Sequence, residues 1–323
     1  MAVSSPMTEG VERWAGQIRA GDVRAIARAI TAIEDQDSRA EELLRRLFPA
    51  TGAAYLVGCT GAPGTGKSTL VDRLAAHYRG VQDSVGIIAV DPTSPFSGGA
   101  ILGDRIRMQG HAGDAGIFIR SVATRGSLGG LTRSTADIAL VLDAAGKQVI
   151  LIETVGVGQD EVDIVRLADC TVVLLVPGLG DDIQSMKAGL MEIADIFVVN
   201  KFDREGGDRL ELQLQAMLEV APDRQGWKPA IVRTVATEGR GVEELAETIA
   251  RFRRHFEDGA ARAARKVEHW KQRLLDLLEQ RLLHRALPGS EGARRLESHA
   301  RDVAGRRKDP YTAVEELLRD AGI

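Results

Sequence analysis

The sequence predicts an α/β protein built on a doubly wound, mostly parallel β-sheet, and three observations lead to this prediction. First, short apolar runs recur along the middle of the 323-residue chain, and several are apolar throughout, as is typical of strands buried on both faces. Second, stretches with the apolar spacing of helices separate many of these runs. Third, a glycine-rich turn joins the first run to the helix after it. Strands that alternate with helices favour a parallel sheet with ligands at the carboxyl ends of its strands.

The predicted elements follow one another in a regular order. The predicted strands are 53–59, 85–90, 116–119, 149–152, 171–176, 196–199 and 230–234. The predicted helices among them are 67–79, 99–111, 131–145, 160–168, 183–193, 205–219 and 241–255. Before them, residues 11–48 are expected to form two helices that break at Gly21-Asp22, with Asp22 as the N-cap of the second. After His255 only helical stretches follow, at 260–286, 291–304 and 311–320.

This order predicts three parts: an N-terminal helical extension (1–50), a central domain that contains the sheet (51–256) and a C-terminal helical arm (257–323). The long helix of the arm carries an apolar stripe of Trp270, Leu274, Leu277, Leu278 and Leu282. We expect this stripe to pack on a second subunit, because no part of the sheet needs it as a cover. The alternative is that the arm folds back on its own domain.

Composition excludes several classes of protein. With 42 Lys and Arg against 46 Asp and Glu, the net charge is −4, which excludes a globally basic nucleic-acid binder. No apolar run is long enough to span a membrane, and the first residues lack a signal-peptide pattern. Cys59 and Cys170 lie in apolar runs and are expected to be buried, inert thiols. We therefore expect a cytoplasmic protein with no nucleic-acid or membrane partner.

A phosphate-binding loop follows the first predicted strand. Residues 61–68 match the pattern G-x-x-x-x-G-K-[ST] at every position. Such a loop turns backbone N–H groups onto phosphate oxygens, and the next helix adds partial positive charge at its N-terminus. Lys67 is expected to reach the β- and γ-phosphates, and the Ser68 hydroxyl to ligate Mg²⁺. The sequence thus predicts a P-loop NTPase with the nucleotide-binding residues Gly61, Ala62, Pro63, Gly64, Thr65, Gly66, Lys67 and Ser68.

A second motif predicts the base. Asn200-Lys201-Phe202-Asp203 ends a predicted strand and resembles the guanine-specificity motif of GTPases. An Asp carboxylate there can accept from the N1–H and the exocyclic amino group of guanine. Adenine lacks this pair of donors, and a site built for two hydrogen bonds rejects a base that leaves it unpaired. Asn200 and Lys201 are expected to brace the loop, and Val235-Ala236-Thr237 to offer a backbone N–H to guanine O6.

Acidic residues at strand ends are candidates for the Mg²⁺ site. Glu153, with Gly156 three residues later, resembles the Asp-x-x-Gly motif of GTPases, in which the acid holds Mg²⁺ through water and the Gly N–H binds the γ-phosphate. Glu in place of Asp lengthens the acid's reach by one methylene. Asp91 ends another predicted strand, and Asp104 follows it. The alternatives are a strand-end Glu153 in solvent, Asp91 as a turn residue and Asp104 as a surface charge.

Together these segments resemble one family, the MeaB-type G-protein chaperones of methylmalonyl-CoA mutase, also called the ArgK family. The resemblance spans nearly the whole chain and adds Thr69 to the nucleotide-binding residues. It rests on residues 61–69, 91–95, 103–108, 120–121, 126–131, 153–159 and 200–203.

The resemblance implies a GTPase that binds an adenosylcobalamin-dependent acyl-CoA mutase. GTP binding and hydrolysis would then gate delivery of the cobalamin and protect the mutase from inactivation. The resemblance also implies a homodimer through the C-terminal arm and an additional switch loop at 177–187. Lys187 in this loop, brought to the γ-phosphate by a partner, would stabilise developing charge as an arginine finger does. The alternative is an ordinary strand-to-helix loop.

The sequence therefore predicts a Mg²⁺-dependent GTPase that binds GTP and GDP and acts on a partner enzyme. The predicted catalytic residues are Lys67, Asp91, Asp104, Glu153 and Lys187, and the predicted metal ligands are Ser68, Asp91, Asp104 and Glu153. One alternative is a metallochaperone GTPase of the nickel-insertion type, although the six His residues are scattered and both Cys residues are apolar in context. Another is a scaffold with an inactive site, which the presence of Lys67, Ser68, Glu153 and Asp203 disfavours.

Overall fold

The computed structural model describes residues 6–91, 109–111, 113–123, 130–154, 167–178, 193–220, 226–257 and 260–323. The chain divides into two compact units, unit 1 (Met1–Ala261) and unit 2 (Arg262–Ile323), and each is described by itself. Within the described ranges, no helix has both the length and the apolar character needed to cross a membrane.

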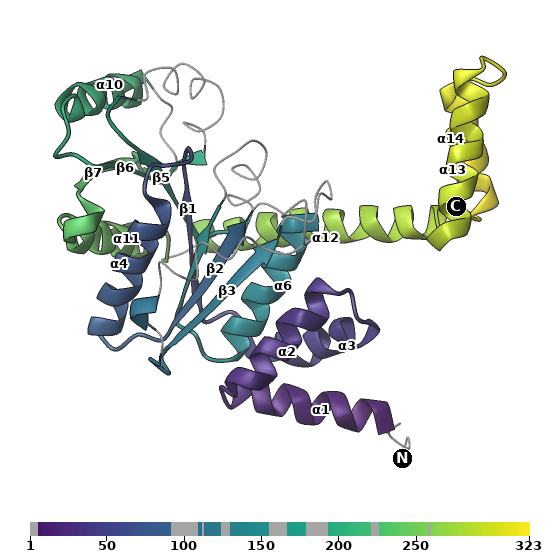
Figure 1. Ribbon diagram of the computed structural model, residues 1–323, viewed down its shortest axis with the longest axis horizontal. Coiled ribbons are helices and arrows are strands. Elements are labelled where there is room, and N and C mark those ends of the chain that lie inside the picture. The colour runs from purple at the N-terminus through teal and green to yellow at the C-terminus, as the bar shows by residue number, and fades with distance from the viewer. Residues whose placement is uncertain are drawn as a thin grey trace. The chain divides into compact units, whose positions relative to one another are not determined.

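Unit 1 is built on a seven-stranded sheet of order β3-β2-β4-β1-β5-β6-β7, in which all neighbouring strands are parallel (Figure 1). The strands are β1 (Tyr55–Thr60), β2 (Val85–Asp91), β3 (Ile117–Ala123), β4 (Val149–Glu153), β5 (Cys170–Leu175), β6 (Ile196–Asn200) and β7 (Ala230–Thr234). Because β1 is central and the chain winds outward from it to both edges, the predicted doubly wound parallel sheet is confirmed.

Helices cover both faces of this sheet. On one face, α4 (Lys67–Gly80) and α11 (Val242–Glu257) pack on β-strand residues such as Val57 and Leu151. On the other, α6 (Gly130–Ala144) packs beside Ile150, and α10 (Gly207–Val220) packs beside Phe197. Alternate strand residues therefore enter different cores, as the pleat of a strand requires. Both Cys59 and Cys170 are buried, as predicted, and burial raises the pKa of the Cys59 thiol to about 12.

The N-terminal extension contains three helices, so the prediction of two was wrong. They are α1 (Pro6–Arg19), α2 (Val23–Glu34) and α3 (Ser38–Leu47), followed by the 3-10 turn η1 (Phe48–Ala50). Asp22 caps α2 as predicted, because its carboxylate accepts from the N–H of Ala25 at 2.7 Å. The missed break falls at Gln36, which has a φ of 54°, and at Asp37, whose carboxylate accepts from the N–H of Arg39.

Five of the strands, β1, β2, β3, β4 and β6, end later than the apolar pattern predicted. β3, which was predicted to end at Ile119, continues through Arg120 to Ala123. In the fold the Arg120 guanidinium pairs with Glu34 of α2 and donates to the Thr31 hydroxyl at 3.3 Å, so the N-terminal helices supply its partners. β4 likewise continues to Glu153, which is a buried strand residue.

Other predicted helices lie wholly or partly outside the described residues. Nearly all of 160–168 and 183–193 lies outside them. Of 99–111, only the 3-10 turn η2 (Gln109–His111) is described. A further 3-10 turn, η3 (Ala236–Glu238), follows β7.

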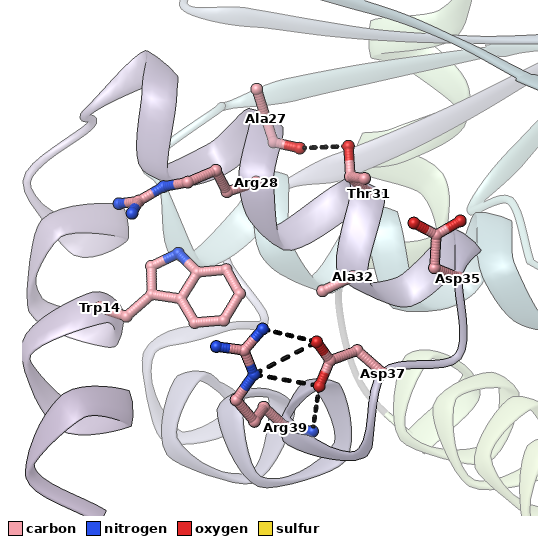
Figure 2. Close-up of a pocket in the computed structure, with 8 residues that line it drawn as sticks. All are labelled: Trp14, Ala27, Arg28, Thr31, Ala32, Asp35, Asp37 and Arg39. Carbon is pink, nitrogen blue, oxygen red and sulfur yellow. Dashed lines mark hydrogen bonds and ion pairs between the residues drawn. The ribbon is translucent and has the colours of Figure 1, made fainter. Parts of the chain in front are cut away.

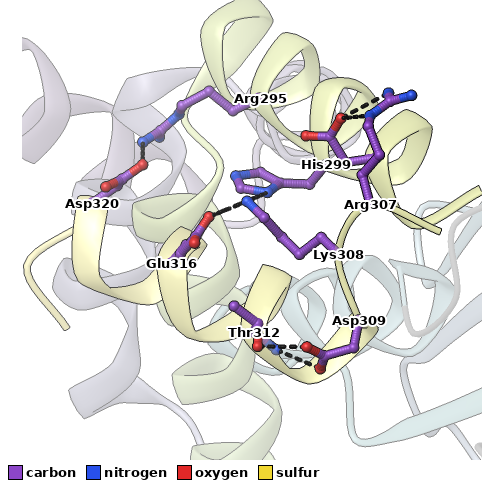
Figure 3. Close-up of polar contacts among 9 residues, drawn as sticks. Arg295, His299, Arg307, Lys308, Asp309, Thr312, Glu316 and Asp320 are labelled. Atoms are coloured by element: carbon purple, nitrogen blue, oxygen red, sulfur yellow. Dashed lines mark hydrogen bonds and ion pairs between the residues drawn. The ribbon is translucent and has the colours of Figure 1, made fainter. Parts of the chain in front are cut away.

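Polar contacts hold much of unit 2 together. Its helices are α12 (Ala260–Ala286), α13 (Gly289–Ala304) and α14 (Pro310–Asp320). Figure 3 shows Lys308 and His299 both directed at Glu316. The Nδ1 atom of His299 lies 3.8 Å from the Glu316 carboxylate. Asp309 caps α14 by accepting from two backbone N–H groups at 3.0 Å. Large apolar side chains meanwhile remain exposed in this unit, among them Val267, Leu274, Leu275, Leu278, Leu282, Leu283, Leu296, Tyr311, Val314 and Leu318.

Candidate nucleotide-binding site

The predicted site segments gather where parallel strands of unit 1 end. The loop 61–66 leaves β1, Glu153 ends β4, Asn200 ends β6, and η3 follows β7. Because all strands of the sheet point the same way, these ends meet at one edge, which is where α/β sheets bind their ligands. The site is therefore assembled from segments that are far apart in the sequence.

Two glycines let the loop 61–66 pass close to its neighbours. At Gly61, with a φ of 142°, a Cβ would lie 2.3 Å from the carbonyl oxygen of Leu174 on β5. At Gly66, with a φ of 96°, a Cβ would lie 2.5 Å from the amide nitrogen of Asn200. Only glycine combines such a φ with so little space. The strand β5 and the Asn200 side chain thus form the back of the loop.

The Lys67 ammonium lies within this loop. Lys67 is the first residue of α4 and is 6% exposed. Its Nζ donates to the carbonyl oxygens of Gly61 at 2.7 Å and Ala62 at 3.1 Å. A buried cation at a helix N-terminus, beside a loop with this pattern, is suited to bind phosphate.

The Ser68 hydroxyl and the Glu153 carboxylate meet in a buried contact. Ser68 Oγ donates to Glu153 Oε1 at 2.6 Å, and the two residues are 7% and 5% exposed. The alternative that Glu153 points into solvent is therefore wrong. Next to it, the Thr154 hydroxyl donates to the Thr60 hydroxyl at 2.9 Å, which joins the ends of β4 and β1. A hydroxyl and a carboxylate oxygen so close together are the hard donors that Mg²⁺ prefers, so these residues fit that ion.

The Asn200 amide links three segments of the site. Its Nδ2 donates to the carbonyl oxygen of Thr65 at 2.8 Å. Its Oδ1 accepts from the Thr234 hydroxyl at 2.9 Å and from the N–H of Ala236 at 3.1 Å. Asn200 is 2% exposed, so these bonds form away from water. The phosphate loop, the end of β6 and the segment after β7 are thereby held at fixed separations.

Lys201 makes a second link to the phosphate loop. Its Nζ donates to the carbonyl oxygen of Gly64 at 2.7 Å, and its backbone has a φ of 55°, which is uncommon for a residue with a side chain. This left-handed turn directs the chain away from β6. Asp203, two residues further on, is exposed.

The segment Val235-Ala236-Thr237 is held on both sides. The N–H of Val235 donates to the carbonyl oxygen of Arg240 at 3.1 Å. From the phosphate-loop helix α4, Arg73 Nη2 donates to the carbonyl oxygen of Thr237 at 2.9 Å. Arg73 and Thr234 were not predicted to support the site. Nothing in the sequence near Arg73 indicates its contact with the site. Thr234, in contrast, lies directly before the predicted segment, and this position could have indicated its role.

The remaining predicted site residues divide into three groups. Ala62, Pro63 and Thr69 belong to the phosphate loop and the first turn of α4. Asp91 is the last residue of β2, and only its backbone is described. Three residues lie outside the described ranges: Asp104, Gly156 and Lys187.

A separate hollow of about 470 Å³ lies among the N-terminal helices (Figure 2). The Trp14 ring lies there between the guanidinium groups of Arg28 and Arg39, at 5.8 and 5.9 Å from its centroid. Arg39 also binds Asp37, and this hydrogen bonding lowers the pKa of the Asp37 carboxyl to about 2. Arg39 and Asp37 thus neutralise one another within this hollow, and none of the predicted site residues belongs to it. Its lining residues are Trp14, Ala27, Arg28, Thr31, Ala32, Asp35, Asp37 and Arg39.

The fold and this site define the chain as a P-loop protein. The family described as methylmalonyl Co-A mutase-associated GTPase MeaB matches residues 26–291. A putative GTPase of Pyrococcus abyssi is 48% identical over 310 residues, which are 94% of each chain. The GTPase ArgK of Escherichia coli is 35% identical over 78% of each chain. The mitochondrial methylmalonic aciduria type A homolog of Mus musculus is 30% identical over 97% of this chain and 81% of its own.

The chain belongs to the MeaB family and is a GTPase. A crystal structure described as a LAO/AO transport system kinase has the same fold, with a TM-score of 0.73, 24% identity and full coverage of both chains. The resemblance that the motifs indicated is thus confirmed at the level of the family.

We predict that Gly66→Ala destabilises the protein more than Gly64→Ala. Both residues have positive φ, 96° and 82°, so each substitution costs about 1–2 kcal/mol of backbone strain. Only at Gly66 does the new Cβ meet Asn200, whereas at Gly64 nothing lies within 4 Å. Loss of the Asn200–Thr65 hydrogen bond adds about 1 kcal/mol. Urea unfolding measures the difference, and equal losses in the two variants would contradict the contact.

Proposed function

We propose that this GTPase is a Mg²⁺-dependent chaperone of an adenosylcobalamin-dependent acyl-CoA mutase of the methylmalonyl-CoA type. GTP binding and hydrolysis gate delivery of the cobalamin and protect the mutase from inactivation. The observation that carries the proposal is the match of residues 26–291 to a family described by its association with methylmalonyl-CoA mutase. The family match also favours this partner over the nickel-insertion alternative.

The guanine base is recognised by Asp203 in this proposal. The support is geometric: Asn200 and Lys201 bind the phosphate loop through Thr65 and Gly64, so the segment that carries Asp203 begins beside the loop that would hold the phosphates. The backbone N–H groups of Val235, Ala236 and Thr237 belong to the adjoining segment, which Asn200 also holds. One nucleotide can then contact the loop 61–66 with its phosphates and these two segments with its base.

The phosphates and Mg²⁺ are bound at the other end of the site. Lys67 is the cation beside the β- and γ-phosphates, and Ser68 and Glu153 are the residues that would hold Mg²⁺. The ion would neutralise phosphate charge during hydrolysis. The buried contact between Ser68 and Glu153 supports this assignment, because it places a hydroxyl and an acid side by side at the start of α4. Roles for Asp91, Asp104, Gly156 and Lys187 remain predictions from the sequence, as does the cytoplasmic location.

Asp203→Asn is predicted to change the base that the site prefers from guanine to xanthine. The carboxylate accepts two hydrogen bonds from guanine, whereas an amide presents a donor and an acceptor, which suits the 2-oxo group of xanthine. A loss of one charged hydrogen bond corresponds to about 1.5–3 kcal/mol, or about 10- to 100-fold in GDP affinity. Calorimetric titration with GDP and xanthosine diphosphate checks this. Unchanged GDP affinity in Asp203→Asn would remove Asp203 from base recognition.

The partner proposal predicts a nucleotide-dependent complex. The full chain, mixed with purified methylmalonyl-CoA mutase, should co-elute from a sizing column to an extent that differs between GDP and a non-hydrolysable GTP analogue. Lys67→Ala should remove this difference, because the buried cation beside the phosphates is lost. The mutase should also stimulate hydrolysis of GTP. Absence of both co-elution and stimulation would contradict the proposal while leaving the GTPase assignment intact.

We further propose that the arm forms a homodimer. The support is the exposed apolar stripe of α12, in which Leu274 and Leu278 are 63% and 53% exposed. Burying each would contribute about 1.5–3 kcal/mol.

The double variant Leu274→Glu/Leu278→Glu is therefore expected to be monomeric by light scattering, because each carboxylate would have to be desolvated. The variant should still bind GDP. Lys271→Gln, an exposed change on the same helix, is the control and should remain dimeric. A dimer that persists in the double variant would place the interface elsewhere.

A further inference from the structure

We propose that Arg233 of β7 is a positioning residue for guanine selectivity, which it supports by stacking on Phe202 and so fixing the backbone that presents Asp203. The inference rests on the proposed role of Asp203 in reading the base. It extends that role to two residues, Arg233 and Phe202, that belong to no phosphate- or metal-binding segment.

Strand register places β7 beside the last residues of β6, directly before the turn at Lys201. Thr234 pairs with Asn200 and Arg233 pairs with Val199. Because consecutive strand residues point to opposite faces, Thr234 is buried and binds the Asn200 amide, while Arg233 is directed to the other face. There the guanidinium carbon of Arg233 lies 4.6 Å from the centroid of the Phe202 ring. Two adjacent residues of one strand thus hold the residues on either side of Lys201.

The Phe202 ring is confined from several directions. It packs against the apolar core between the sheet and α10, which contains Leu210 and Leu214. Where the ring passes Gly207, a Cβ on that glycine would lie 3.1 Å from it, so the glycine permits the close approach. Arg233 then closes the remaining side. A cation this close to an aromatic ring is attracted by the negative charge of its face.

Glu211 holds Arg233 in place over the ring. Arg233 Nη2 lies 2.6 Å from Glu211 Oε2, and the Glu211 side chain is only 11% exposed, although the Arg233 side chain is 55% exposed. This pairing also raises the pKa of the Arg233 guanidinium. The half-exposed arginine is therefore anchored by a buried partner on α10, unlike an arginine in a surface ion pair.

The stack affects Asp203 because Asp203 is held mainly through its backbone. Among the described residues, none makes a hydrogen bond or ion pair with the Asp203 carboxylate. The preceding residue is fixed twice, by the Phe202 N–H, which donates to the carbonyl oxygen of Thr234 at 3.1 Å, and by the Phe202 ring. Once Arg233 is lost, the ring can leave its position and the peptide plane before Asp203 can rotate. The two hydrogen bonds to guanine depend on that plane.

The test compares GDP with inosine diphosphate, which lacks the exocyclic amino group and so makes only one of the two hydrogen bonds with Asp203. Calorimetric Kd values for both ligands give a selectivity ratio for the full chain. In Arg233→Met, which keeps an unbranched apolar stem but removes the guanidinium group, we expect this ratio to fall about fivefold, the scale of one cation–π contact. Arg233→Lys, which restores the charge, should recover part of the ratio. A merely structural defect would weaken both ligands equally and leave the ratio unchanged.

Three further variants make the outcome decisive. Glu211→Gln removes the anchor of Arg233 and should lower the ratio in the same direction, which provides a test if Arg233→Met does not fold. Arg45→Met removes an exposed arginine that pairs with Glu41 on α3 and contacts no ring, and it should leave the ratio unchanged. Asp203→Asn should abolish the selectivity.

If Arg233→Met or Glu211→Gln keeps the wild-type ratio of GDP to inosine diphosphate affinity while Asp203→Asn loses it, the positioning role of Arg233 is overturned. The proposed role of Asp203 in base recognition then stands. A normal ratio in Asp203→Asn would overturn the proposed role of Asp203 in base recognition, and the inference with it.

Discussion

The buried amide of Asn200 is the interaction on which the geometry of the site depends. It makes three hydrogen bonds, to the phosphate loop, to Thr234 and to the segment after β7. Each bond contributes about 1 kcal/mol to stability, but any partner left unsatisfied in this buried place would cost about 1–3 kcal/mol. The cost of a broken bond, more than the gain from a made one, keeps the three segments together. The separation of the phosphate loop from the ends of β6 and β7 follows from this single side chain.

The phosphate end of the site shows how a departure from the usual GTPase motif is accommodated. Glu153 stands where many GTPases have Asp, and its extra methylene reaches the Ser68 hydroxyl directly at 2.6 Å. Both groups are buried beside the first turn of α4, where the helix N-terminus favours negative charge. The Lys67 ammonium, bound to two loop carbonyls, adds a fixed positive charge nearby. The site therefore has its charges arranged before any ligand contributes its own.

The two units are stabilised in different ways. In unit 1, apolar residues on both faces of the sheet pack under helices, so the strands that carry the site residues have little freedom to move. In unit 2 few of the described apolar residues are buried, and ion pairs such as Arg295–Asp320 connect α13 with α14. Exposed ion pairs contribute little to stability, so unit 2 has much to gain from covering its exposed leucines.

Local patterns in the sequence were sufficient for the parallel sheet, the phosphate loop and the Asn-Lys-x-Asp motif. Each depends on residues close together in the chain: apolar runs for strands, glycines for the loop, and a strand end for the motif. The same patterns missed the break between α2 and α3, because nothing local shows that Gln36 adopts a φ of 54°. They also ended β3 too early, because the partner that allows Arg120 to continue the strand is Glu34, from another part of the chain.

The sequence by itself determined which chemical groups the candidate site contains, namely a lysine, a serine, an acid and the Asn-Lys-x-Asp motif. Only the tertiary structure decided how they are joined: Asn200 reaches Thr65, 135 residues away, and Glu153 reaches Ser68, 85 residues away. Arg233 and Phe202 are likewise far apart along the chain, so the sequence alone does not predict their contact. The pairing of β6 with β7 brings them together. The physical reason is that hydrogen bonds and ring contacts act over a few ångströms, and only folding brings residues from distant strands within that distance.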